Sequence, residues 1–203
     1  MQNEILKKEL IRWEVISFIW IVFVGGAMHE VYRQTGYWKP IALIAPVNES
    51  LWEHMKMTFW PALFIIFIQY LFIHFKRQNV SNFWLSKLVL LILSPILVFT
   101  TYVIYTLIVE SMGGLAAVGP TAVLALLCAI ISQLVCCRLI ISENYSYSAS
   151  RYIPIGYVLL IISFSSFTYF PPKIYLFEHH DNYKPNGQFG LEADREQSGR
   201  NRK

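Results

Sequence analysis

Residues 57–73 read M-T-F-W-P-A-L-F-I-I-F-I-Q-Y-L-F-I, seventeen residues without a charged side chain. The segment just before it, residues 46–56, reads P-V-N-E-S-L-W-E-H-M-K, and five of its eleven residues can carry charge or hydrogen-bond strongly. A membrane-spanning helix needs about 20 mostly apolar residues. The two segments together therefore predict a transmembrane helix with an unusually polar beginning.

The composition of the whole chain points the same way. Of its 203 residues, 55% are hydrophobic and 15% are charged, and the mean hydropathy is +0.44. A soluble domain carries roughly 25% charged residues, so the chain is predicted to be an integral membrane protein. The net charge is only +4, and the tail after residue 171 mixes six basic with five acidic residues. This mixture excludes a basic arm for nucleic acid.

Apolar segments recur five times and predict an all-α, polytopic bundle of five transmembrane helices. The predicted spans are residues 13–33, 49–75, 82–110, 115–141 and 151–170. Residues 1–170 form the transmembrane domain, and residues 171–203 form a polar tail. We expect the first part of the tail to pack over the outer helix ends and the remainder to be disordered.

The distribution of Lys and Arg predicts the orientation, because cytoplasmic loops of membrane proteins carry more positive charge. With a cytoplasmic N-terminus, the inner side holds eight basic residues and the outer side five. The eight are Lys7, Lys8, Arg12, Lys76, Arg77, Lys87, Arg138 and Arg151, and the five are Arg33, Lys39, Lys56, Lys173 and Lys184. We therefore expect a multi-pass protein of the cell membrane, surrounded by the lipid bilayer, with an extracytoplasmic tail.

The polar residues near the ends of the first two spans fall on one side of the membrane, because this follows from the parity of the spans. Only 14 uncharged residues separate Glu14 from His29. They cover about 21 Å of helix, less than the hydrocarbon core of about 30 Å. An ionisable group of the first helix is therefore expected below the interface, where such groups usually face a partner or a water-filled cavity.

The start of the second span has both structural and functional interpretations. Ser50 and Glu53 fit a capping box, in which each side chain binds the other's backbone N–H. On a helical projection Glu49, Glu53 and Lys56 share one face, and His54 lies about 100° away. The residues expected to bind a small polar ligand or a lipid headgroup are His29, Glu30, Asn48, Glu49, Glu53, His54 and Lys56.

Two alternatives to this binding role stay open: an enzyme, which could depend on zinc, and a purely structural cluster. Glu53 and His54 could act as general acid and base in a membrane-embedded hydrolase or lipid-modifying enzyme. His29, His54 and His179 could hold zinc, whose usual ligands include imidazole and carboxylate groups. The other possibility is that the cluster only fixes helix packing.

Three sequence motifs resemble those of an uncharacterised family of small bacterial membrane proteins, a domain of unknown function. The first is His29, Tyr32, Thr35 and Gly36, the second is V-N-E-S-L-W-E-H-M-K from Val47 to Lys56, and the third is Pro171, Pro172 and Phe177 with Gly187 to Gly190. The tail departs from the family pattern at Phe177 to Asp181. The resemblance implies the membrane architecture and the candidate residues, and it implies no activity.

Overall fold

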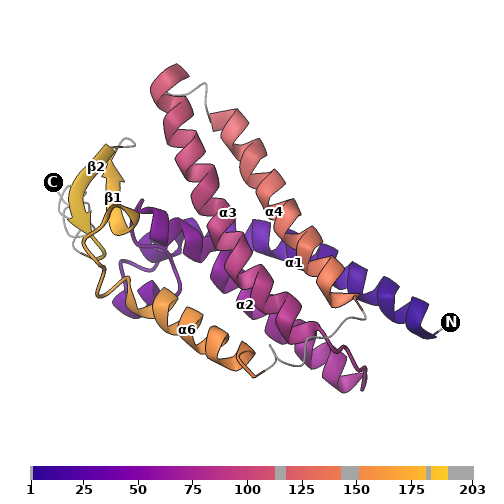
Figure 1. Cartoon of the computed structure of the whole chain (residues 1–203). Helices are drawn as coiled ribbons and strands as arrows, with labels where there is room; N and C mark the ends of the chain where they lie inside the picture. The colour runs from indigo at the N-terminus through magenta and orange to yellow at the C-terminus, as the bar shows by residue number, and fades with distance from the viewer. Residues whose placement is uncertain (1, 113–117, 143–150, 182–183, 192–203) are drawn as a thin grey trace.

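The structure is a computed structural model that describes residues 2–112, 118–142, 151–181 and 184–191. This part of the chain is helical except for one hairpin, so the predicted helical bundle is confirmed (Figure 1). Its elements are α1 (Gln2–Gln34), η1 (Lys39–Leu43), α2 (Leu51–Phe75), α3 (Phe83–Met112), α4 (Val118–Ile140), α6 (Ile153–Ser166), η3 (Tyr175–Phe177), β1 (Glu178–Asp181) and β2 (Lys184–Phe189).

Four of the helices are long and apolar enough to cross a membrane. These stretches are Glu4–Gln34, Leu51–Phe75, Phe83–Tyr105 and Val123–Ile140. The fifth predicted span, residues 151–170, contains α6, a helix of 14 residues that ends at Ser166. Large apolar side chains such as Phe23, Phe67 and Leu159 point outward and are at least 60% exposed, as expected where helices face lipid.

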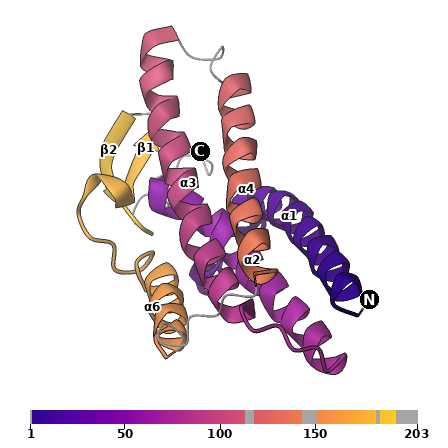
Figure 2. The ribbon, with the colours of Figure 1, turned by 45° about the vertical axis from the view of Figure 1, so that its right-hand side comes forward.

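The first four helices pack in a ring, with α1 on α2, α2 on α3, α3 on α4 and α4 on α1. Helix α6 and the hairpin lie beside α2 and α3, on the side away from α4 (Figures 1 and 2). Helix α1 ends, helix α2 begins and the hairpin lies at one end of the bundle, and we call this the hairpin end. The opposite end, where α1 begins, is the N-terminal end.

Helices α1 and α2 approach each other closely at one glycine. Pro61 has no N–H, so the carbonyl of Met57 one turn earlier has no helical donor. Gly25 of α1 packs against this carbonyl, and a Cβ on Gly25 would lie only 2.3 Å from the Met57 oxygen. In the described part of the chain, no atom lies within 4 Å of such a Cβ on the neighbouring Gly26. Gly25 therefore allows the contact between the two helices.

An aromatic cluster joins α6 and the tail to the start of α2. The ring of Trp52 stacks on Phe164 with 4.5 Å between centroids and also contacts Phe167 and Phe177. Phe164 stacks in turn on Phe59 at 4.1 Å. These contacts hold the end of α6 and the start of the hairpin at the hairpin end.

The hairpin was not predicted from the sequence. Its strands pair antiparallel, with Glu178 opposite Phe189, and the register is irregular between Glu178 and His180. Residues 178–189 lack the alternation of apolar and polar side chains that indicates a strand. The backbone turns instead at Gly187 and Gly190, which adopt φ angles of +78° and +51°.

Candidate functional site

The end of α1 is fixed by a glycine motif. Gly36 has a φ of +67° and donates its N–H to the Arg33 carbonyl, while the N–H of Tyr37 bonds to the Tyr32 carbonyl. These two bonds form a Schellman motif, whose usual apolar contact is made here by the rings of Tyr32 and Tyr37, 5.6 Å apart. The motif sets the last turn of α1 in place, and with it His29.

The start of α2 forms only half of the predicted capping box. The Ser50 hydroxyl accepts a hydrogen bond from the N–H of Glu53 at 3.3 Å, so Ser50 is the N-cap. The N–H of Ser50 is bound by the Asn48 side chain at 2.8 Å. The carboxylate of Glu53 reaches the N–H of Val47 instead, at 3.1 Å. The reciprocal bond is absent because this carboxylate has a second partner, Lys56.

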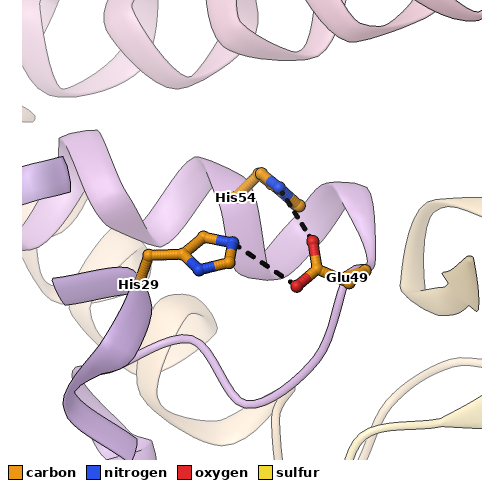
Figure 3. Close-up of side chains that lie close together, drawn as sticks. All are labelled: His29, Glu49 and His54. Carbon is orange, nitrogen blue, oxygen red and sulfur yellow. Dashed lines mark ion pairs between the residues drawn. The ribbon is translucent and has the colours of Figure 1, made fainter. Parts of the chain in front are cut away.

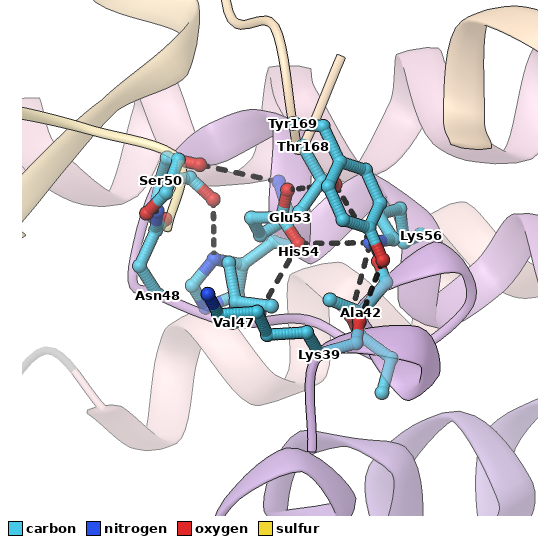
Figure 4. Close-up of polar contacts among 12 residues, drawn as sticks. Lys39, Ala42, Val47, Asn48, Ser50, Glu53, His54, Lys56, Thr168 and Tyr169 are labelled. Carbon is cyan, nitrogen blue, oxygen red and sulfur yellow. Dashed lines mark hydrogen bonds and ion pairs between the residues drawn. The ribbon is translucent and has the colours of Figure 1, made fainter. Parts of the chain in front are cut away.

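Glu53 and Lys56 form a buried ion pair. The Lys56 ammonium donates to Glu53 Oε2 at 3.0 Å, to Thr168 Oγ1 at 2.9 Å, and to the carbonyls of Ala42 and Ala45 at 2.6 and 2.9 Å (Figure 4). The Thr168 hydroxyl donates to Glu53 Oε1 at 2.6 Å. We call these three side chains the Glu53–Lys56 cluster. It joins α2 to the loop before it and to the end of α6.

This cluster has no capacity left for a ligand. The side chains of Lys56 and Glu53 are 0% and 2% exposed, and the ammonium already faces four acceptors with its three protons. Among the described residues, neither side chain hydrogen-bonds to His29 or His54. The structure therefore does not bring Glu53 and Lys56 together with the two histidines.

The two histidines meet around Glu49 instead. His29 Nε2 lies 3.4 Å from Glu49 Oε1, and His54 Nε2 lies 3.4 Å from Glu49 Oε2 (Figure 3). One donor atom from each residue can be chosen so that all three lie within 4.8 Å of one another. The side chains are 36%, 47% and 23% exposed for His29, Glu49 and His54. We call these three residues the His–Glu–His site.

Glu49 groups with the histidines because it precedes the helix. The helical projection places Glu49 on the face of Glu53 and Lys56, but α2 begins at Leu51 after the Ser50 cap. A projection applies only inside a helix, so this placement is wrong. The adjacent imidazole of His29 holds the pKa of Glu49 below its ordinary value, aided by the charge of His54 and opposed by burial. The carboxylate therefore stays ionised.

The hairpin covers the loop that carries Glu49. Asn48 donates its side-chain amide to the Gly190 carbonyl at 3.0 Å, and the N–H of Glu49 donates to His179 Nδ1 at 3.0 Å. His179 was expected as a metal ligand, but its Nδ1 is engaged by the backbone and it is not in the His–Glu–His site. His180 is buried between the rings of Tyr102 and Tyr175. Burial lowers the pKa of His180.

A polar pocket of about 110 Å³ adjoins the site, between the end of α1 and the loop before α2. It has room for several water molecules or one small polar group. Arg33 at its rim is 68% exposed and pairs with Glu30. The lining residues are His29, Glu30, Tyr32, Arg33, Tyr37, Pro46, Val47, Asn48 and Glu49.

A second buried charge cluster was missed as such from the sequence. Glu14 accepts hydrogen bonds from Lys87 at 2.6 Å, Gln69 at 3.2 Å and Gln133 at 2.5 Å, and Cys136 lies 3.4 Å away. One carboxylate thus joins α1, α2, α3 and α4. The 14-residue uncharged run had predicted an ionisable group of the first helix below the membrane interface, and the structure shows that Glu14 is buried inside the bundle. We call these five residues the Glu14 cluster.

The burial of two lysines corrects the count behind the predicted orientation. Lys87 was assigned to a cytoplasmic loop and Lys56 to the outer side, but both side chains are completely buried. Eight inner basic residues less Lys87 leaves seven, and five outer residues less Lys56 leaves four. The excess of basic residues on the N-terminal side stays, so the predicted orientation does not depend on the two buried lysines.

A family model described as a family of unknown function (DUF6512) matches residues 1–191. No curated protein matches the chain, and no solved structure does.

Proposed function

The chain belongs to the family of unknown function DUF6512, and we propose that it is a membrane protein that binds a small polar ligand or lipid headgroup at its hairpin end. In this proposal the ligand occupies the polar pocket and the adjoining His–Glu–His site. The Glu53–Lys56 cluster holds the fold and takes no part in binding.

We further propose five membrane crossings, with a cytoplasmic N-terminus and the tail outside the cell membrane. The packing of α6 supports the fifth crossing. Near its start, the Tyr157 hydroxyl donates to the carbonyl of Trp84 at the start of α3. Just after its end, Thr168 contacts Lys56 at the start of α2. Helix α6 therefore runs between the same two ends of the bundle as α2, despite its 14 residues.

The observation that carries the binding proposal is the composition of the pocket. It combines two carboxylates, a guanidinium and an imidazole on a molecule whose other surfaces expose large apolar side chains. The Arg33 side chain is 68% exposed although its guanidinium pairs with Glu30, and a planar guanidinium suits a phosphate or carboxylate group. The mixture of charges fits a zwitterionic headgroup such as phosphoethanolamine.

The test is thermal stabilisation of the detergent-purified protein by O-phosphoethanolamine and by glycerol 1-phosphate. We expect the unfolding temperature to rise with probe concentration and the rise to disappear in Arg33→Gln. Arg12→Gln is the matched control, because Arg12 is an exposed arginine on α1 at the N-terminal end. If neither probe shifts the wild type, or if both variants respond equally, the pocket does not bind headgroups.

A metal-dependent membrane hydrolase is the second candidate. Its support is the donor set of the His–Glu–His site, since two histidines and one glutamate also hold catalytic zinc in known hydrolases. Glu53, expected as a catalytic residue, is buried, so His54 and Glu49 carry this candidate. It predicts zinc-dependent cleavage of a nitrophenyl ester or phosphate that Glu49→Gln abolishes.

A further inference from the structure

We propose that His29, Glu49 and His54 bind one divalent transition-metal ion of the zinc class. The inference goes beyond the proposed function, because it assigns a metal ion to the site at the hairpin end. It concerns the ion alone and requires neither the headgroup nor a hydrolytic reaction.

The distances fit a shared ion better than direct hydrogen bonds. Zinc binds nitrogen and oxygen ligands at about 2.0–2.2 Å, so adjacent ligand atoms of a tetrahedral site lie roughly 3.3 Å apart. Each histidine Nε2 lies 3.4 Å from a Glu49 oxygen. A charge-assisted hydrogen bond between nitrogen and carboxylate is about 2.7–2.9 Å long. The two contacts go to different oxygens of Glu49, and with one ligand atom taken from each residue the three atoms lie within 4.8 Å of one another, close enough for one ion to draw them together.

The proton on His54 supports the same conclusion. Its Nδ1 lies 2.9 Å from the carbonyl oxygen of Ser50, which can only accept, so Nδ1 carries a proton. In the neutral ring Nε2 is then a lone pair that faces the Glu49 carboxylate. Two hydrogen-bond acceptors that face each other repel unless a cation lies between them. An imidazole whose other nitrogen donates to a backbone carbonyl is the usual form of a histidine ligand.

His29 has the matching arrangement on the other side. Its Nε2 faces Glu49, and its Nδ1 lies 3.6 Å from Glu30 Oε1. Glu30 is paired in turn with Arg33. A carboxylate behind a histidine ligand orients the ring and raises its basicity. At 3.6 Å Glu30 is beyond hydrogen-bond distance of His29, so it adds negative charge behind the ring without fixing its orientation.

The donor set selects the class of metal. Calcium and magnesium prefer oxygen ligands, whereas imidazole suits zinc, copper and nickel. Three protein ligands leave a fourth position open, and in zinc sites an open position is taken by water or by an exogenous group. The adjoining pocket offers space for that group.

Protons are the rival occupants of the site. Two imidazolium rings could flank the ionised Glu49 in place of an ion. The two states differ in their response to pH, because metal binding requires deprotonated imidazoles. Acidification therefore releases a metal and strengthens the imidazolium pairs.

The test is titration of Zn²⁺ into the chelator-stripped full-length protein in detergent, followed by calorimetry. We expect one ion per chain, affinity that falls from about pH 7.5 to about pH 5.5, and no binding of Mg²⁺. Affinity should fall at least 10-fold in His54→Asn and Glu49→Gln, and by less than in these two variants in Glu30→Gln. Co²⁺ should give the intense visible absorption of a tetrahedral site, which His54→Asn removes.

His74→Gln is the matched control, because His74 is an exposed histidine at the other end of α2 and should leave affinity unchanged. Unfolding temperatures of the metal-free variants show that each is folded. The inference is overturned if wild type binds no Zn²⁺, or if His54→Asn and Glu49→Gln bind it as tightly as wild type. If a headgroup probe raises the unfolding temperature but Zn²⁺ does not bind, the metal proposal fails and the proposed function stands. If Zn²⁺ binds but neither headgroup probe raises the unfolding temperature, the metal proposal stands and the proposed function fails.

Discussion

Replacing Lys56 by methionine should destabilise the protein by about 3–5 kcal/mol, the cost of removing one partner of a buried ion pair. The change keeps the length of the side chain and removes a charge that is 0% exposed. It leaves the Glu53 carboxylate with the Val47 N–H and the Thr168 hydroxyl as its remaining donors. The carbonyls of Ala42 and Ala45 lose the ammonium as well, and an unsatisfied buried group costs about 1–3 kcal/mol.

The assay is reversible unfolding in mixed micelles by titration with a denaturing detergent, applied to a double-mutant cycle. Glu53→Gln alone should also destabilise, because it leaves the ammonium without its counter-ion. The double variant with Lys56→Met should be more stable than the sum of the single effects predicts, since no unpaired charge remains. If Lys56→Met unfolds at the wild-type midpoint, or the two effects simply add, the pair does not hold the fold.

Three further predictions address other parts of the molecule. Gly25→Ala should destabilise by about 1–3 kcal/mol through overpacking against α2, whereas Gly26→Ala, with free space around its Cβ, should be neutral or stabilising; equal effects in the same unfolding assay would contradict the close approach. Burial lowers the pKa of His180 below its ordinary 6.5, so its contribution to stability is present above about pH 6.5 and is lost on acidification. The unfolding midpoint of His180→Phe, measured relative to that of wild type, should therefore be higher at about pH 5.5 than at about pH 7.5. A difference between the two proteins that does not change with pH would refute this. Lys87→Met should destabilise by about 3–5 kcal/mol because it leaves Glu14 buried without its cation, and unchanged stability would show that the pair is not needed.

Much of the fold could be predicted because lipid-facing helices carry a strong composition signal. Four predicted spans correspond to long apolar helices, since about 20 apolar residues have few other uses. The signal is weaker for α6, where the apolar run continues past Ser166 although the helix ends there. The hairpin gave no signal, because its order depends on contacts such as that between Asn48 and Gly190, 142 residues apart.

The sequence predicted which region of the chain holds the site, but not which side chains of that region contact one another. Run length alone predicted an ionisable group of the first helix below the membrane interface, and Glu14 is indeed buried among the helices, although its depth in a bilayer stays a prediction. Its partner Lys87 lies 73 residues away, and no local pattern links the two. The membership of Glu49 depended on whether the second helix begins before or after it. Helix boundaries are uncertain by one or two residues, which is enough to move a side chain to another cluster.

The burial of the polar groups separates those that hold the fold from those that can bind. Lys56 has a full set of partners and no access to solvent, and its bonds to the Ala42 and Ala45 carbonyls fix the loop that leads to Glu49. Damage to the Glu53–Lys56 cluster should therefore lower both stability and affinity for the ion. The side chains of the His–Glu–His site are partly exposed, so changes there should lower affinity with little loss of stability. A variant that loses zinc and keeps its unfolding midpoint thus identifies a ligand residue, whereas one that loses both identifies a residue of the supporting cluster.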